Sequence, residues 1–206
     1  MKKTISLLLL LSAWLSYAQS GIEYESFAQA AQENSVLYRG RQATQYAFNY
    51  NGVPYWSPDG FREGSVDYNG KTYYGVLLNI DACVQDLLVK YSAEMPAVAL
   101  DRDHVTSCVI AGTPYANLAL REVRKAEPGY YAVLADGATP VYYRVDKFLR
   151  KSTGSKNDVN IGYDDPDFKP NVLQYFAHRG RYYTIQNDAL KKIGKRRAMK
   201  LAAYAK

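Results

Sequence analysis

Hydrophobic and polar residues alternate along much of the chain, in short segments separated by turn-forming pairs. The clearest case is the segment 64–80, in which Asn69-Gly70 separates two alternating runs. Asn-Gly is favoured in two-residue type I′ turns, because both central residues of such a turn take a positive φ. The pattern therefore predicts a β-hairpin with strands over 64–68 and 71–80.

The same reasoning predicts further strands and turns. A second Asn-Gly pair, Asn51-Gly52, predicts a hairpin of residues 45–50 and 53–56. Other tight turns are predicted at Asp136-Gly137, Arg179-Gly180 and Asn187-Asp188. The remaining predicted strands are 84–91, 95–100, 105–111, 114–121, 130–134, 141–149, 172–178, 181–185 and 189–193. Many short strands joined by tight turns predict a mainly β fold, an antiparallel meander that forms a sandwich or a partly closed barrel.

Helical periodicity is confined to the ends of the chain. Residues 195–205 place four small or apolar residues on one face and basic residues around the rest, which predicts a short C-terminal amphipathic helix. Residues 23–34 fit a second short helix. The segment 150–171 is rich in Gly, Pro, Ser, Asn and Asp and predicts a long loop, and loops of this length often carry function.

The first eighteen residues have the pattern of a cleavable signal peptide. Lys2 and Lys3 precede an apolar run over 5–15, and Ser16-Tyr17-Ala18 supplies the small residues of a cleavage site after Ala18. The run is shorter than the roughly 20 apolar residues of a membrane-spanning helix. We therefore expect an exported protein, periplasmic, outer-membrane associated or secreted, whose residues 19–206 form a single β-rich domain without a transmembrane helix.

The net charge and the aromatic content of the chain limit the classes of binding partner that we expect. The net charge is +6, and the one dense basic cluster, 191–200, fits a solvated helix face, so nucleic acid is not an expected partner. Tyrosine is unusually frequent, with 20 residues against 6 Phe and 2 Trp. Tyrosine suits half-buried strands, which favours cross-strand packing, while an aromatic surface for a glycan or peptide is the alternative. The candidate ligand-binding residues are Trp56, Tyr73, Tyr74, Tyr130 and Tyr142, with a core position as the alternative for Trp56.

The two cysteines, Cys83 and Cys108, lie in segments of strand-like sequence. Export to an oxidising compartment allows a disulfide between them, and two buried unbridged thiols are the alternative. Two cysteines alone do not make a zinc site, which requires four clustered ligands.

Motifs of known catalytic chemistry are missing from the sequence. It contains no Gly-x-Ser-x-Gly elbow, no His-Glu-x-x-His pair and no glycine-rich phosphate loop, and no cofactor is predicted. His104 and Cys108 would lie about 13 Å apart on a strand, too far for a catalytic pair. Hard oxygen ligands within 158–167 suggest calcium, although the spacing is not that of an EF-hand and also fits a turn. The candidate calcium ligands are Asp158, Asp164, Asp165 and Asp167.

Several segments together resemble an exported, tyrosine-rich family of β proteins from Bacteroidetes. They are 51–56, 64–73, 78–81, 85–89, 128–131 and 161–163, and the resemblance covers about residues 35–206. The shared features are turns and aromatic residues, so the resemblance implies an envelope or secreted protein and carries over no catalytic residues.

These observations favour a non-enzymatic exported protein that binds a glycan, a peptide or a neighbouring envelope protein. The first alternative is a structural or assembly component of an outer-membrane complex. The second is a hydrolase that uses acidic residues such as Asp81, Asp164 and Asp165.

Overall fold

The computed structural model describes residues 35–46, 50–151 and 174–204. The chain divides into two units, Met1–Arg39 and Gly40–Lys206. In the first unit the described part is the short 3-10 turn η2, Val36–Tyr38, where the Ser35 hydroxyl accepts a hydrogen bond from the Leu37 N–H at 3.3 Å. The sheet and the α-helix belong to the second unit.

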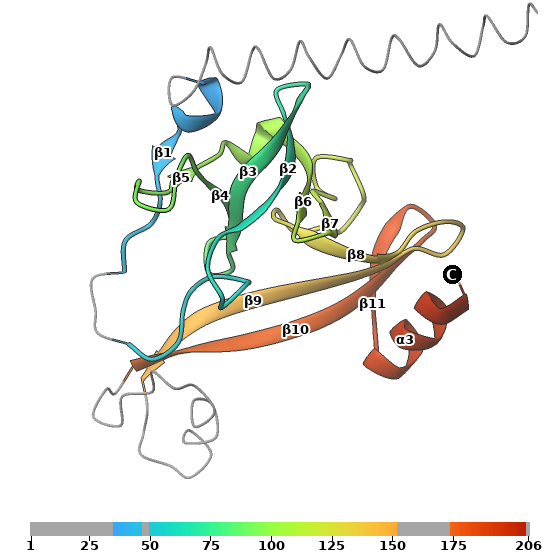
Figure 1. The fold of residues 1–206 in the computed structure, drawn as a ribbon. Helices are drawn as coiled ribbons and strands as arrows, with labels where there is room; N and C mark the ends of the chain where they lie inside the picture. Colours follow the sequence, from blue (N-terminus) through green and yellow to red (C-terminus); the bar gives the residue numbers. More distant parts are fainter. Residues whose placement is uncertain (1–34, 47–49, 152–173, 205–206) are drawn as a thin grey trace, which may run out of the picture. The chain divides into compact units, whose positions relative to one another are not determined.

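Within the described residues of the second unit, eleven strands form one sheet in which neighbouring strands are antiparallel (Figure 1). The spatial order is β1-β5-β4-β3-β2-β6-β7-β8-β9-β10-β11, so β1 and β11 are the two edges and the sheet is open. The strands are β1 Arg41–Gln42, β2 Arg62–Tyr68, β3 Lys71–Asp81, β4 Asp86–Lys90, β5 Val98–Ala99, β6 Val105–Ile110, β7 Thr113–Ala116, β8 Tyr131–Ala135, β9 Val141–Lys151, β10 Gln174–Gln186 and β11 Ala189–Ile193. A 3-10 turn, η3 Arg102–His104, precedes β6, and the helix α3, Lys195–Tyr204, follows β11. The predicted mainly β, antiparallel fold with a C-terminal helix is confirmed.

Two predicted hairpins are confirmed by their backbone angles. Between β2 and β3, Asn69 and Gly70 have φ values of 52° and 73°, as a type I′ turn requires. Between β10 and β11, Asn187 and Asp188 have φ values of 51° and 58°. Both turns are specified by two adjacent residues, which is why the sequence pattern was sufficient to predict them.

The predicted hairpin at Asn51-Gly52 is wrong. Asn51 pairs instead with β10: its N–H donates to the Gln174 carbonyl at 2.8 Å, and its carbonyl accepts from the Phe176 N–H at 3.1 Å. Tyr55 forms an isolated bridge with Asp81 at the end of β3. The backbone groups that a local hairpin would use are therefore bonded to strands that lie far away in the sequence.

The predicted turn at Arg179-Gly180 is also wrong, because β10 runs through it without interruption. Gly180 pairs with Val145 of β9, and the ring of Tyr143 lies over the glycine. A Cβ at Gly180 would come 2.2 Å from the Tyr143 hydroxyl oxygen. The glycine therefore permits a close side-chain approach within a strand and does not reverse the chain. The predicted helix over 23–34 and nearly all of the predicted loop over 150–171 lie outside the described residues.

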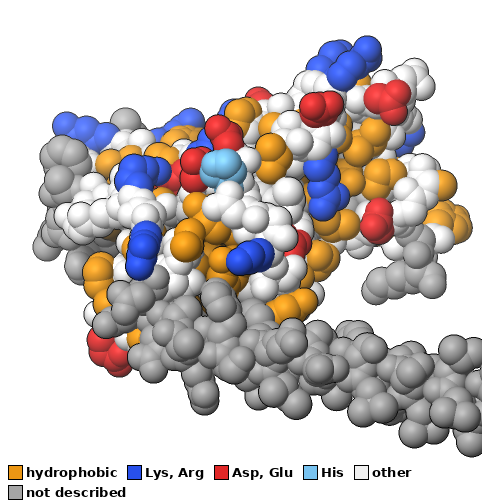
Figure 2. All heavy atoms as spheres, turned by 90° about the horizontal axis from the view of Figure 1, so that it is seen from above, with side chains coloured by type: hydrophobic (Ala, Val, Ile, Leu, Met, Phe, Trp, Pro, Cys, Tyr) orange, Lys and Arg blue, Asp and Glu red, His pale blue; other side chains and the backbone are white. Residues whose placement is uncertain are grey.

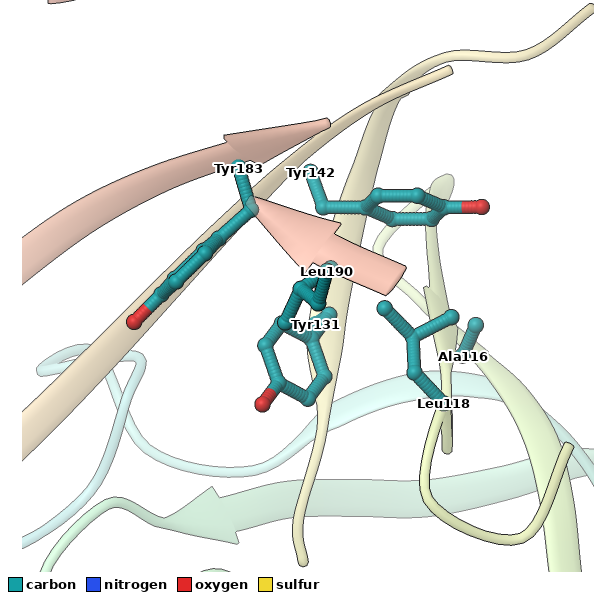
Figure 3. Close-up of a cluster of buried hydrophobic side chains, with 6 residues drawn as sticks. All are labelled: Ala116, Leu118, Tyr131, Tyr142, Tyr183 and Leu190. Carbon is teal, nitrogen blue, oxygen red and sulfur yellow. The ribbon is translucent and has the colours of Figure 1, made fainter. Parts of the chain in front are cut away.

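Tyrosines from neighbouring strands form much of the core. Tyr131, Tyr142 and Tyr183 pack together with Ala116, Leu118 and Leu190, and their hydroxyl groups point away from the cluster (Figure 3). Tyr142 and Tyr183 are direct partners across β9 and β10. Cross-strand packing thus accounts for these rings, each of which buries its apolar body in the core.

A second small cluster holds α3 on the sheet. Ala198 and Leu201 of the helix pack against Val141, Tyr182 and Ile193. In Figure 1 the helix lies at one end of the long ribbon formed by β9 and β10. No helix among the described residues is long and apolar enough to cross a bilayer.

Candidate functional site

The two faces of the β9–β10 ribbon have different environments. Side chains alternate between the faces of a strand, and directly paired residues share a face. One face, which we call the Lys147 face, carries Tyr143, Val145 and Lys147. The other, the Arg144 face, carries in pairs along the ribbon Tyr142 with Tyr183, Arg144 with Arg181, Asp146 with Arg179, Phe148 with Ala177, and Arg150 with Tyr175.

The Lys147 face is covered along most of its length, although Leu149 near its far end is 37% exposed. Next to α3, the Trp56 ring packs edge-on against Tyr143, with centroids 5.9 Å apart. Farther along, the Lys147 ammonium donates to the backbone carbonyls of Val53, at 2.9 Å, and Tyr55. At the far end, Phe176 packs against two tyrosines, Tyr46 and Tyr50, with centroids 5.2 and 4.6 Å away. This face is therefore used for internal packing.

The turn between β3 and β4 closes on the edge of β9. Past Tyr143, β8 no longer pairs with β9, and the turn takes its place. The Lys147 N–H donates to the Ala82 carbonyl at 2.8 Å, and the Gln85 amide donates to the Val145 carbonyl at 2.8 Å. A Cβ on Gly129 would come 2.7 Å from the Gln85 side-chain oxygen, so only glycine lets the chain pass here. These bonds join strands that are separated by several others in the sheet order.

A partly buried polar cluster lies beside this turn. The Asp81 carboxylate accepts hydrogen bonds from the Tyr46 hydroxyl, at 2.9 and 2.8 Å, and from the Cys83 N–H at 2.9 Å. Burial raises the pKa of Asp81 above its ordinary value, although these hydrogen bonds oppose the shift. Burial also lowers the pKa of the Lys147 ammonium and raises the pKa of the Cys83 thiol to about 11. The thiol is therefore protonated near neutral pH and is a weak nucleophile, and the cluster joins chain segments together.

The raised pKa of Asp81 predicts how the stability of the fold changes with pH. An acid whose pKa is higher in the folded than in the unfolded state destabilises the fold when it is ionised, and this cost disappears as the pH falls. Asp81→Asn keeps a similar shape and removes the charge. We expect the stability of the unmodified protein, relative to Asp81→Asn, to rise between neutral pH and about pH 4. Urea unfolding at several pH values measures this difference, and a difference that falls toward acid contradicts the assignment.

The Arg144 face begins as a buried ionic network. The Arg144 side chain is 6% exposed, and it donates to Asp146 at 2.9 Å and to the Pro128 carbonyl at 3.0 Å. Arg181 donates to the other Asp146 oxygen at 2.5 Å and to Glu127 at 3.2 Å. Two guanidinium groups and two carboxylates thus neutralise each other, and this part of the face is structural.

Beyond Asp146 the Arg144 face is mixed: Ala177 and Tyr175 are buried and Phe148 is half-buried, while two arginines remain exposed. The guanidinium carbons of Arg150 and Arg179 lie 4.8 and 6.0 Å from the ring centre of Phe148. Both arginines are exposed, and neither forms an ion pair with a described residue. We call Phe148, Arg150 and Arg179 the cationic strip. Its two guanidinium groups flank one aromatic ring on a rigid pair of strands.

The chemistry of the cationic strip suits an anionic ligand with an apolar face. A guanidinium group binds carboxylate, sulfate or phosphate through two parallel hydrogen bonds. Contact with the Phe148 ring limits the motion of both side chains, which reduces the entropy that binding would cost. The partly exposed ring offers an apolar surface to a sugar ring.

The aromatic residues that the sequence suggested for ligand binding do not form one surface. Tyr73, Tyr130 and Tyr142 are buried, whereas Tyr74 is 60% exposed. Trp56 packs edge-on against two rings of the sheet, Tyr115 and Tyr143.

Cys83 lies in the β3–β4 turn and Cys108 in β6, and the two thiols are not bridged in the structure. The four proposed calcium ligands, Asp158, Asp164, Asp165 and Asp167, lie outside the described residues. Among the described residues, no three His, Cys, Asp or Glu side chains cluster as metal ligands do.

The distribution of charge on the face in Figure 2 does not by itself identify a binding surface. Basic, acidic and hydrophobic side chains are interspersed on the face shown in Figure 2. Comparison with protein-family models, curated proteins and solved structures finds no match for this chain.

Proposed function

We propose that this chain is a non-enzymatic exported protein that binds an acidic glycan through the cationic strip. The observation that carries the proposal is that the exposed Arg150 and Arg179 flank Phe148 without a carboxylate partner among the described residues. The neighbouring Arg144 and Arg181 have two carboxylate partners. Within the part of the chain that the structure describes, one face of the ribbon thus holds two arginines with carboxylate partners beside two arginines without them.

Three features of the chain support a glycan as the ligand. Its N-terminal sequence resembles a signal peptide and favours export. Outside the cytoplasm, acidic polysaccharides are abundant potential ligands. The strip combines two guanidinium groups for acidic substituents with a ring for the apolar side of a sugar. Its position on regular strands suits an extended polymer, because Arg179, Phe148 and Arg150 occupy successive positions along one face of the ribbon.

Isothermal titration calorimetry with defined oligosaccharides tests this proposal. Oligogalacturonate supplies carboxylates, a heparin oligosaccharide supplies sulfates as well, and a cello-oligosaccharide is the neutral control. We expect binding to an acidic oligosaccharide and none to the neutral one. Arg150→Gln with Arg179→Gln should weaken that binding by roughly tenfold or more for each guanidinium removed, because hydrogen bonds to charged groups contribute about 1.5–3 kcal/mol each.

A matched control separates the strip from net charge. Arg196→Gln with Lys200→Gln also removes two positive charges, but from exposed positions on α3. This variant should bind the acidic oligosaccharide nearly as well as the unmodified protein. Equal losses in both variants, or no binding to either acidic oligosaccharide, would overturn the proposal. In the second case, one stoichiometric protein partner in envelope crosslinking would favour the assembly role.

A further inference from the structure

The segment formed by β11 and α3 has an unusual charge distribution. No acidic residue occurs from Ala189 to the end of the chain. Six exposed cations lie within ten residues, and none of them forms an ion pair with a described residue. They are Lys191, Lys192, Lys195, Arg196, Arg197 and Lys200.

The position of these cations does not favour the helix itself. The first turn of α3 holds no acidic residue, and it contains Lys195, Arg196 and Arg197. The N-terminus of a helix carries a partial positive charge, so cations there destabilise the helix. Packing on the sheet therefore has to hold α3 in place, and helix stability does not explain the choice of residues.

Packing also fixes which side of α3 faces solvent. Ala198 is buried and Leu201 packs beside it, against Val141 and Ile193 of the sheet. The opposite side presents Arg196 with Met199 and Lys200, which follow it by three and four positions and thus lie on the same side of the helix. Met199 is 42% exposed, and Tyr204, one turn beyond Lys200, is 89% exposed. The solvent side of α3 thus combines cations with exposed apolar side chains.

We propose that this side of α3, together with Lys191 of β11, docks on a membrane surface that carries anionic lipid headgroups. Charge complementarity identifies the occupant: cations on and beside α3, with no acidic residue among them, match the phosphate groups of a lipid surface. Basic residues attract a protein to such a surface, while exposed apolar side chains insert at the level of the headgroups. A soluble polyanion would use the cations alone and would leave Met199 and Tyr204 without a partner in the complex.

Vesicle cosedimentation of the full chain tests this docking surface. We expect binding to vesicles of phosphatidylcholine mixed with phosphatidylglycerol, and little binding to vesicles of phosphatidylcholine alone. Each basic residue near such a surface strengthens binding about fivefold. Arg196→Gln with Lys200→Gln should therefore weaken vesicle binding by roughly twenty- to thirtyfold. Met199→Ser should weaken it further by a few fold, because the apolar contribution is lost.

The control variant is Arg150→Gln with Arg179→Gln, which removes the same charge from the other end of the ribbon. It should bind the vesicles as the unmodified protein does, so that failure of this proposal and failure of the glycan proposal give different results. Equal binding to both kinds of vesicle, or unchanged binding by the α3 variant, would refute docking. Binding of a heparin oligosaccharide to α3 without vesicle binding would assign the cations to a soluble polyanion and would also refute it.

Discussion

Asp146→Ala should lower the free energy of unfolding by about 3–5 kcal/mol, the loss expected when one member of a buried ionic network is removed. Asp146 accepts hydrogen bonds from Arg144 and Arg181, whose side chains are 6% and 16% exposed. Without its carboxylate, two guanidinium groups would remain close together and poorly solvated, with Glu127 as the remaining acid. Urea unfolding of the purified protein measures the loss as a lower midpoint.

An exposed ion pair provides the control for this variant. Asp59 bonds to Arg62 at 3.0 Å, and both side chains are about half exposed or more. Asp59→Ala should therefore cost at most about 1 kcal/mol. If Asp146→Ala costs no more than Asp59→Ala, the network does not stabilise the ribbon.

The stability that Asp146 and its two arginine partners provide also depends on pH. Burial opposes ionisation of Asp146, but the hydrogen bonds from Arg181 and Arg144 outweigh it and lower the pKa of Asp146. A carboxyl whose pKa is lower in the folded state stabilises the fold above its unfolded pKa, about 3.9, and this stabilisation is lost as the pH falls through the folded value. The gap between the unmodified protein and Asp146→Ala should thus be full at neutral pH and shrink only in strong acid. This is the reverse of the behaviour expected for Asp81.

Gly64→Ala should destabilise the protein by about 3 kcal/mol, the upper part of the usual range for overpacking. Gly64 lies in β2 between β3 and β6, next to an irregularity in the register with β3. A Cβ built on it would come 1.9 Å from the Val109 carbonyl oxygen of β6. That atom is part of the backbone, so relief of the overlap requires a shift of the β2–β6 pairing and not merely of a side chain.

Gly194→Ala is the matched control for Gly64→Ala. Nothing lies within 4 Å of a Cβ at Gly194, and its backbone does not take the positive φ that disfavours other residues. The control should change the free energy of unfolding by less than about 1 kcal/mol. Unfolding midpoints in urea compare the two, and equal values would show that β2 and β6 separate easily at this point.

Those elements whose signal is local could be predicted from the sequence. The β2–β3 hairpin is specified by Asn69-Gly70, and β11 by the reversal at Asn187-Asp188. The helix α3 was predicted to within one residue, because its period of apolar residues is complete within the segment.

The errors arose where a local signal competed with distant partners. Asn51-Gly52 has the same composition as Asn69-Gly70, yet Asn51 bonds to β10, more than 120 residues away in the sequence. Arg179-Gly180 resembles a turn, but the ring of Tyr143 occupies the space that the glycine leaves. Neither contact has a signature in the neighbouring residues.

The cationic strip could not be predicted, because it depends on the register of β9 and β10. Phe148 and Arg150 are two positions apart and share a face of β9. Arg179 joins them only because it pairs with Asp146 in the observed register. A shift of one residue would place Arg179 on the opposite face, beside Lys147. Most of the tyrosines that the sequence suggested for ligand binding are instead buried in the core.

The length of the β9–β10 ribbon has a consequence for the two proposed surfaces. Helix α3 packs at Val141, and Arg150 lies nine positions farther along β9, which is about 30 Å at the rise of a strand. Electrostatic potentials in physiological salt decay over about 8 Å. The negative charge of a bilayer bound to α3 would therefore be almost completely screened at the distance of the cationic strip. It would not repel an acidic polymer bound there. If both proposed surfaces are occupied, the length of the ribbon would allow one molecule to bind two negatively charged partners at once.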